Sequence, residues 1–209
     1  MRGLSSAVLS LAAMALSSLT TYLTFFDARY TLTVATADVA VRMQTSGGRD
    51  AEGNRSATYQ YWPTFNMVMS NRGTRALVVT EIELLKSSDI ERCVVDDENR
   101  MQRYFQGGLF DTVIIEPGTV LPKELEFNLD RIAVEAGPGE TLAPQAETAL
   151  FCARYTVFDP NGRRHEPLAP VLTITRGFEP AEDPEDSPDG TLDVDYPKGA
   201  TTLVRRGMF

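Results

Sequence analysis

This sequence holds a single histidine, His165. An imidazole is the side chain that most readily exchanges a proton near neutral pH. His165 follows a charged turn in which Asn161 and Gly162 supply the tight corner and Arg163 and Arg164 come next. This setting predicts a solvated loop histidine. An enzyme of unrecognised type that uses His165 with neighbouring acids stays open as an alternative function.

The two cysteines, Cys93 and Cys152, are the other residues with a chemistry of their own. In an exported domain a single pair of cysteines favours a disulfide, and two buried free thiols are the alternative. The pair meets if the third and sixth predicted strands are antiparallel neighbours, since Cys93 follows the third and Cys152 lies near the start of the sixth. One histidine and two distant cysteines do not have the spacing of a metal site. No metal, cofactor or catalytic residue is predicted.

The formal net charge of −9 is concentrated in one segment of the chain. Phe178 to Pro197 contains eight acidic residues and no lysine or arginine. The rest of the chain is therefore close to neutral and does not predict the basic surface that nucleic-acid binding requires. Because the segment is also rich in proline and poor in apolar residues, residues 177–209 are expected to form a disordered tail. Its last ten residues regain apolar character and are compatible with a short strand.

The N-terminal segment is the strongest signal in the sequence. Leu4 to Phe26 is a run of 23 residues without a charge, long enough as a helix to cross a bilayer. The sequence therefore predicts a transmembrane anchor over residues 4–26, with residues 1–3 in the cytoplasm and the remainder exported. A cleaved signal peptide is the alternative, because Ala13-Met14-Ala15 has the small-x-small pattern of a cleavage site.

The charges of this segment indicate how the chain is oriented in the membrane, and its small residues indicate whether two such helices can associate. Arg2 is the only charged side chain before the apolar run. It favours a single-pass protein of the inner membrane with its body facing the periplasm or exterior. Ala13, Ser17 and Thr21 recur every four residues on one helix face, a spacing that permits close helix contact. A homodimer through the anchor helix is therefore a further alternative.

After the anchor, apolar residues alternate with polar ones, which is typical of β-strands. The alternation is clear in Phe65 to Ser70 and in Leu77 to Leu84, on the two sides of a short polar corner. Asn71 and Gly73 in this corner are interpreted as residues that tolerate a positive φ. Thr45 to Thr58 is polar and Gly-rich and is predicted as a loop. Strands are predicted over 30–43, with a bulge past residue 35, and over 65–70, 77–84, 111–115, 124–129, 148–158 and 170–176.

About seven strands separated by turn residues predict an all-β fold, an antiparallel β-sandwich over residues 27–176. The exception is Asp96 to Gly107, where helical spacing of apolar residues predicts a short helix or ordered loop. Candidate contacts with a protein partner of unknown identity lie in this insertion and in the late charged turn. They are Met101, Arg103, Tyr104 and Phe105, together with Arg163 and Arg164.

Phe65 to Gly73 is a strand that runs into an Asn-x-Gly corner, and Tyr155 to Gly162 is a late strand that ends in an Asp/Gly hairpin. In these stretches the chain resembles the immunoglobulin-like or fibronectin-III-like sandwich domains of membrane-anchored bacterial envelope proteins, including CARDB-like modules. The resemblance covers Tyr30 to Arg176. It implies a scaffold or binding module and transfers no catalytic residue.

The leading interpretation is a single-pass membrane protein that presents an immunoglobulin-like β-sandwich outside the cytoplasmic membrane. Its role is expected to be non-catalytic binding or scaffolding. An accessory subunit of a larger membrane complex is the first alternative, and the enzyme that uses His165 is the second.

Overall fold

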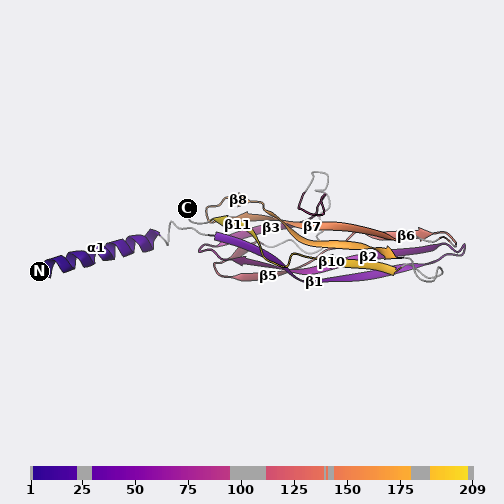
Figure 1. Cartoon of the computed structure of the whole chain (residues 1–209), viewed down its shortest axis with the longest axis horizontal. Helices are drawn as coiled ribbons and strands as arrows, with labels where there is room; N and C mark the ends of the chain where they lie inside the picture. Colours follow the sequence, from indigo (N-terminus) through magenta and orange to yellow (C-terminus); the bar gives the residue numbers. More distant parts are fainter. Residues whose placement is uncertain are drawn as a thin grey trace.

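The computed structural model describes residues 2–22, 30–94, 112–138, 140, 144–179 and 189–206. Figure 1 shows the helix α1 (Arg2–Thr21) and an elongated body of strands. The predicted insertion over 96–107, with Met101, Arg103, Tyr104 and Phe105, lies outside the described residues. The strands are β1 (Tyr30–Arg49), β2 (Arg55–Asn71), β3 (Leu77–Lys86), β4 (Val113–Ile115), β5 (Val120–Glu126), β6 (Ile132–Ala136), β7 (Gln145–Phe158), β8 (Arg164–His165), β9 (Leu168–Glu179), β10 (Asp189–Asp195) and β11 (Thr201–Arg206).

The described N-terminal helix α1 covers residues 4–21 of the anchor predicted over 4–26, and residues 23–26 lie outside the described part of the chain. Seven of its residues are serine or threonine, which lower its hydropathy. In the part of the chain that the structure describes, no helix is long and apolar enough to cross a membrane. The side chains from Ser10 to Tyr22 are all exposed, Leu11, Met14 and Leu16 among them.

The strands form two antiparallel sheets. The first has the order β11-β1-β2-β5, and β6 also pairs with β2. The second has the order β10-β9-β7-β3-β4, with β8 beside β7. Every pair of described strands is antiparallel. The predicted all-β antiparallel fold is confirmed, and the described residues contain more strands than the seven expected.

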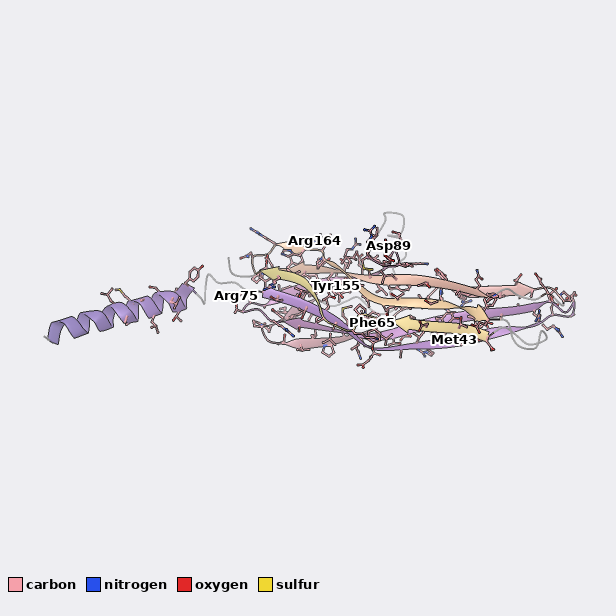
Figure 2. All side chains as sticks on the ribbon, viewed as in Figure 1. Met43, Phe65, Arg75, Asp89, Tyr155 and Arg164 are labelled. Carbon is pink, nitrogen blue, oxygen red and sulfur yellow. A yellow bond between two sulfur atoms is a disulfide. The ribbon has the colours of Figure 1, made fainter. Side chains whose placement is uncertain are left out.

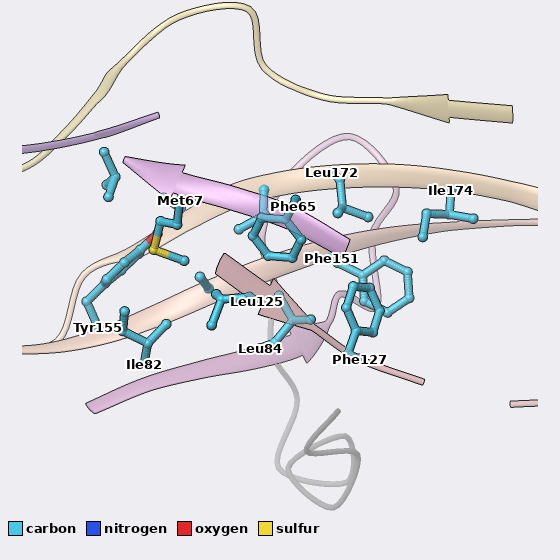
Figure 3. Packing of buried hydrophobic residues seen from close by; sticks show 14 of the residues in the cluster. Phe65, Met67, Ile82, Leu84, Leu125, Phe127, Phe151, Tyr155, Leu172 and Ile174 are labelled. Carbon is cyan, nitrogen blue, oxygen red and sulfur yellow. The ribbon is translucent and has the colours of Figure 1, made fainter. Parts of the chain in front are cut away.

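The inner faces of the two sheets pack against one apolar core. Along β2 every second side chain is buried from Arg55 to Asn71, so one face of this strand turns to the core and the other to solvent. Phe65 of β2 meets Phe127 edge-to-face with ring centroids 6.3 Å apart, and Phe127 lies 5.2 Å from Phe151 of β7. Figure 3 shows these rings with Leu84 and Tyr155 between the sheets. Such aromatic pairs bury much apolar surface and help to fix the register of the strands.

The first hairpin extends well beyond the predicted strands. β1 continues to Arg49 and β2 begins at Arg55, so the loop predicted over Thr45 to Thr58 is mostly strand. Gly47 in this segment has another cause. A Cβ on Gly47 would lie 2.2 Å from the backbone oxygen of Ser56, so this close approach of two strands requires glycine.

The bulge predicted in the first strand is present. The register of β1 against β2 shifts between Ala37 and Ala40, and Asp38 between them has a φ of 51°. Before the bulge, β11 pairs with β1 from Tyr30 to Val34. Beyond the bulge, β1 continues along β2. The bulge therefore separates a part of β1 that has two neighbouring strands from a longer part that follows β2.

The disordered tail predicted over 177–209 is wrong where residues 177–179 and 189–195 form strands, and the short strand compatible with its last ten residues is present as β11. β10 pairs with β9, and β11 pairs with β1. In β10, Leu192 and Val194 pack against the core and alternate with the exposed acids Asp193 and Asp195. The acids thus lie on the solvent side of an edge strand, where charge also discourages pairing with other chains. Residues 180–188 and 207–209 lie outside the described part of the chain.

Candidate functional site

The corner between β2 and β3 is a structural turn that carries the chain from one sheet to the other. Asn71 is 1% exposed, and its Nδ2 donates to the backbone oxygens of Arg75 at 2.7 Å and Ile115 at 2.9 Å. Its Oδ1 accepts a hydrogen bond of 2.9 Å from the N–H of Gly73. The predicted corner is therefore present. The reason given for Asn71 and Gly73 was wrong, because neither has a positive φ. Asn71 acts through its side-chain amide, and Gly73 donates its N–H to that amide.

The corner between β7 and β8 contains the predicted turn residues Asn161 and Gly162. Gly162 has a φ of 75°, which glycine adopts without strain. Oδ1 of Asp159 accepts hydrogen bonds from the N–H groups of Asn161 at 2.8 Å and Arg163 at 3.0 Å. The side chain of Asp159 thus closes the turn that precedes His165.

Asp159 also joins this corner to the start of β1. Its Oδ2 accepts a hydrogen bond of 2.8 Å from the hydroxyl of Tyr30 and lies 3.2 Å from Nε2 of His165. The side chain of Asp159 is 1% exposed and that of His165 is 33% exposed. Burial raises the pKa of Asp159, but hydrogen bonds from Arg163, Tyr30, His165 and Asn161 outweigh it and lower the pKa to about 2. Asp159 is therefore ionised at neutral pH.

This arrangement holds the turn. Each oxygen of Asp159 has two partners among the described residues. The neighbouring Arg164 forms an ion pair with Glu166, and Figure 2 shows it near the end of the body at which β1 begins. Among the described residues, no group of three or more His, Cys, Asp or Glu side chains is placed to hold a metal ion.

Cys93 and Cys152 form a disulfide with their Cα atoms 5.9 Å apart. Of the two states that the sequence left open, the structure has the bonded one. Cys152 lies opposite Leu85 in the antiparallel ladder of β3 and β7, so the predicted neighbourhood of these strands is confirmed. The loop that carries Cys93 is held by buried Ser87, whose Oγ accepts a hydrogen bond of 2.9 Å from the N–H of Val94.

A surface depression of about 620 Å³ lies at the tip of the first hairpin. Arg49 and Arg55 line it together with Asp50 and Glu135, so these four charges cancel. Arg55 is buried and donates a hydrogen bond of 2.6 Å to the backbone oxygen of Glu140. The polar residues of this depression thus have a structural role at the end of the hairpin, and we do not select it as the candidate site.

A second depression, of about 540 Å³, lies on the outer face of the first sheet. Trp62 is the only tryptophan in the chain, and it points outward because Tyr61 and Pro63 on either side of it are buried. A large aromatic ring on the solvent side of a strand does not serve the core, so it is the candidate functional residue. Figure 2 shows Met43, a lining residue, well along the body from Arg164. The lining residues are Arg42, Met43, Gln44, Trp62 and Glu126.

On one side of Trp62 the neighbouring strand supplies an ion pair. Arg42 of β1 lies directly opposite Trp62 in the ladder, and its guanidinium is 5.9 Å from the ring centroid. The same guanidinium is 3.1 Å from Oε1 of Glu126 in β5. The ion pair therefore reaches across β2 beside the indole.

On the other side of Trp62 the neighbouring groups are amides. The N–H of Phe127 donates to the backbone oxygen of Pro63, and the N–H of Leu129 donates to that of Tyr61. Asn128 lies between these two bonds and is therefore beside the indole. Nε2 of Gln60 donates to Oδ1 of Asn128 at 2.7 Å, and Nε of Arg131 donates to Oε1 of Gln60 at 2.8 Å. We name the surface formed by Arg42, Gln44, Gln60, Trp62, Glu126 and Asn128 the Trp62 face.

Sequence reasoning missed the Trp62 face, because the second strand was predicted to begin only at Phe65. The available signal was the phase of the strand. Tyr59, Tyr61 and Pro63 alternate with polar residues toward Phe65, and Trp62 is out of phase with them. An aromatic residue out of phase with the buried positions of a strand indicates a surface ring.

No protein-family model matches the chain, and no curated protein matches it. Among solved structures, the chain is similar to the crystal structure of a candidate ApaA protein from Bordetella pertussis. That similarity has 14% sequence identity, covers 66% of this chain and 91% of the other, and has a TM-score of 0.30. A similarity at this level carries no argument about function, so the interpretation of the site rests on its own geometry.

Proposed function

We propose that this chain is an exported, non-catalytic binding or scaffolding module, an immunoglobulin-like sandwich held outside the cytoplasmic membrane by its N-terminal segment. The observation that carries the proposal is the disulfide between Cys93 and Cys152. Structural disulfides form and persist in oxidising compartments and are rare in the cytosol. The uncharged run from Leu4 to Phe26 supports export, since a segment of this kind directs a chain to the membrane.

The N-terminal helix supports attachment as well as export. α1 exposes the large apolar side chains of Leu11, Met14, Leu16 and Leu19, and exposed apolar surface of this kind favours contact with lipid or with another protein. The uncharged run also continues past α1 as far as Phe26. The same side chains favour a second candidate function, an accessory subunit of a membrane complex, in which they pack against a helix of another subunit.

The outer face of the first sheet supports binding over catalysis. His165 faces a carboxylate whose oxygens are all occupied. The Trp62 face instead presents an aromatic ring, amides and an ion pair to solvent. These are groups that orient a ligand by stacking and hydrogen bonding.

The test is cell fractionation of a host that expresses the full chain, with free thiols alkylated before lysis. We expect Cys93 and Cys152 in one disulfide-linked peptide pair after non-reducing digestion. We also expect the body to become protease-accessible in spheroplasts and to remain with the membrane fraction. Two alkylated cysteines in a cytosolic protein would overturn the proposal. N-terminal sequencing separates an attached form that retains Leu4 to Phe26 from a secreted form cut after Ala15.

A further inference from the structure

We propose that the Trp62 face binds a neutral saccharide, with a pyranose ring stacked on Trp62 and its hydroxyl groups hydrogen-bonded to the surrounding side chains. The inference rests on the proposed binding function and names its ligand class. A pyranose has an apolar C–H face and a rim of hydroxyls, so it needs an aromatic plane ringed by donors and acceptors. The Trp62 face has this combination.

The aromatic plane is accessible. Trp62 is partly exposed on the outward side of β2, and its indole N–H has no hydrogen-bond partner within the described part of the chain. Arg42 lies over the ring, but its side chain is 70% exposed. An exposed cation–π contact of this kind is weak. The guanidinium is therefore free to move from the ring to a ligand hydroxyl while it stays beside Glu126.

The donors and acceptors around the ring are already positioned. Gln60 is held between Asn128 and Arg131 by hydrogen bonds of 2.7 Å and 2.8 Å. Gln44, which lines the depression, has a side-chain amide without a hydrogen-bond partner among the residues that the structure describes. Side chains fixed before the ligand arrives lower the entropic cost of binding. This face therefore supplies both ordered and available amides.

The chemistry of the face selects against other classes of ligand. Protein interfaces surround anchors such as Trp and Arg with further well-packed, desolvated contacts, whereas β2 turns the polar residues Thr58, Thr64 and Asn66 outward on either side of Trp62. A nucleic acid needs a basic surface, and the charge of Arg42 is balanced by Glu126. The volume of about 540 Å³ lies within the range of about 300–1,000 Å³ that is usual for small-ligand sites.

The fluorescence of Trp62 tests the inference directly, because no other tryptophan contributes to the signal. The full chain with its disulfide intact is titrated with cellotetraose, tetra-N-acetylchitotetraose and mannotetraose as neutral pyranose oligomers. We expect a saturable change in emission intensity and wavelength with at least one of them, since a stacked sugar ring removes water from the indole. No saturable change in emission and no heat in calorimetry with all three would overturn the inference.

Variants separate the face from nonspecific contact. By calorimetry, Trp62→Ala should weaken binding about tenfold or more, and Gln44→Ala should weaken it by a smaller factor. The matched control is Ile114→Ala, which removes a side chain that is 62% exposed on the other sheet and should leave affinity unchanged. Thermal unfolding checks that each variant is folded. Unchanged affinity in Trp62→Ala, or equal losses in Trp62→Ala and Ile114→Ala, would contradict the assignment.

The failure of this inference is distinguishable from the failure of the proposed function. A photoreactive residue in place of Gln44 reports what touches the face in cells. If the exported, disulfide-bonded chain ignores all three oligosaccharides but cross-links to a protein through this position, the saccharide inference is wrong and the binding function stands. If the chain binds saccharides but is reduced and cytosolic, the proposed location is wrong and the ligand assignment stands.

Discussion

The hydroxyl of Tyr30 donates a hydrogen bond of 2.8 Å to the carboxylate of Asp159, across 129 positions of the sequence. Tyr30 is the first residue of β1 in one sheet, and Asp159 closes a turn between strands of the other. The bond therefore ties together the two layers where the chain enters the sandwich. Both groups are buried, so neither has water as an easy substitute partner.

Acid should destabilise the protein through Asp159. Its pKa in the folded state is about 2, below the ordinary value of 3.8. A carboxyl with a depressed folded pKa contributes stability above its unfolded pKa and loses that contribution as the pH falls through the folded pKa. We expect about 2 kcal/mol of the free energy of unfolding to disappear between about pH 5 and pH 2.

Urea denaturation across this pH range checks the prediction. Asp159→Asn should lower stability at pH 7 and flatten the acid dependence, and Tyr30→Phe should do both to a smaller extent. The matched control is Glu166→Gln, an exposed acid of the same hairpin, which should leave the slope unchanged. An Asp159→Asn variant with the wild-type slope would contradict the prediction.

Removing one partner of the Glu83–Arg154 ion pair should lower the free energy of unfolding strongly, whereas replacing both partners with apolar residues should lower it little. The two residues are cross-strand partners in β3 and β7, Glu83 is 9% exposed, and Nε of Arg154 donates to its Oε2 at 2.7 Å. Arg154→Met should lower the free energy of unfolding by about 3 kcal/mol, because it removes the cation beside a buried carboxylate. Changing Glu83 to Met as well should recover most of the loss. A double-mutant cycle in urea measures this, and a double variant no more stable than Arg154→Met would contradict it.

Two adjacent glycines in β1 should respond differently to the same change. A Cβ on Gly47 would lie 2.2 Å from the oxygen of Ser56, whereas one on Gly48 meets nothing within 4 Å. Gly47→Ala should cost about 2 kcal/mol, because two strands must separate to admit the methyl group. Gly48→Ala, the matched control, should be neutral or slightly stabilising. Denaturation and amide hydrogen exchange along β1 and β2 measure the difference, and equal effects would show that the close approach is not maintained.

Loss of the disulfide should reduce stability substantially. Cys93 and Cys152 are 59 positions apart, and closing a loop of this length contributes about 4 kcal/mol in the chain-entropy model. The variant with both residues changed to serine should therefore unfold at much lower urea. A reducing agent should bring the wild-type midpoint down to that of the variant and leave the variant unchanged. A variant midpoint equal to that of the oxidised wild type would contradict the prediction.

The fold class was predictable because buried and exposed positions of a strand appear in the local sequence as alternating apolar and polar residues. Phe65 to Ser70 shows it clearly, and the strands on either side of the Asn71 corner were found from it. In Asp189 to Asp195 the same period is present, but the acids dominate the composition and the segment was interpreted as disordered. Gly47 permits a close backbone contact, and local sequence does not distinguish such a glycine from a loop glycine.

The sites were less predictable, because their members come from distant parts of the chain. The cysteines were paired from an expected strand neighbourhood, and the chain holds only two. Nothing in the sequence near His165 indicates Tyr30, whose hydroxyl reaches Asp159 only after both sheets have formed. The Trp62 face likewise needs β1, β2 and β5 side by side before Arg42 and Glu126 meet.

The pairing of β1 also determines how the body carries mechanical load. Tyr30 lies opposite Arg206, so the first and last described strands of the body begin and end at the same place. A force that draws these two residues apart opens the ladder one hydrogen bond at a time. A force that enters at Tyr30 and is resisted at the far tip of the hairpin is instead carried by the covalent backbone of β1, which is one continuous strand between these points. An extended backbone has little length left to give, so the body resists stretching along its long axis more than separation of Tyr30 from Arg206.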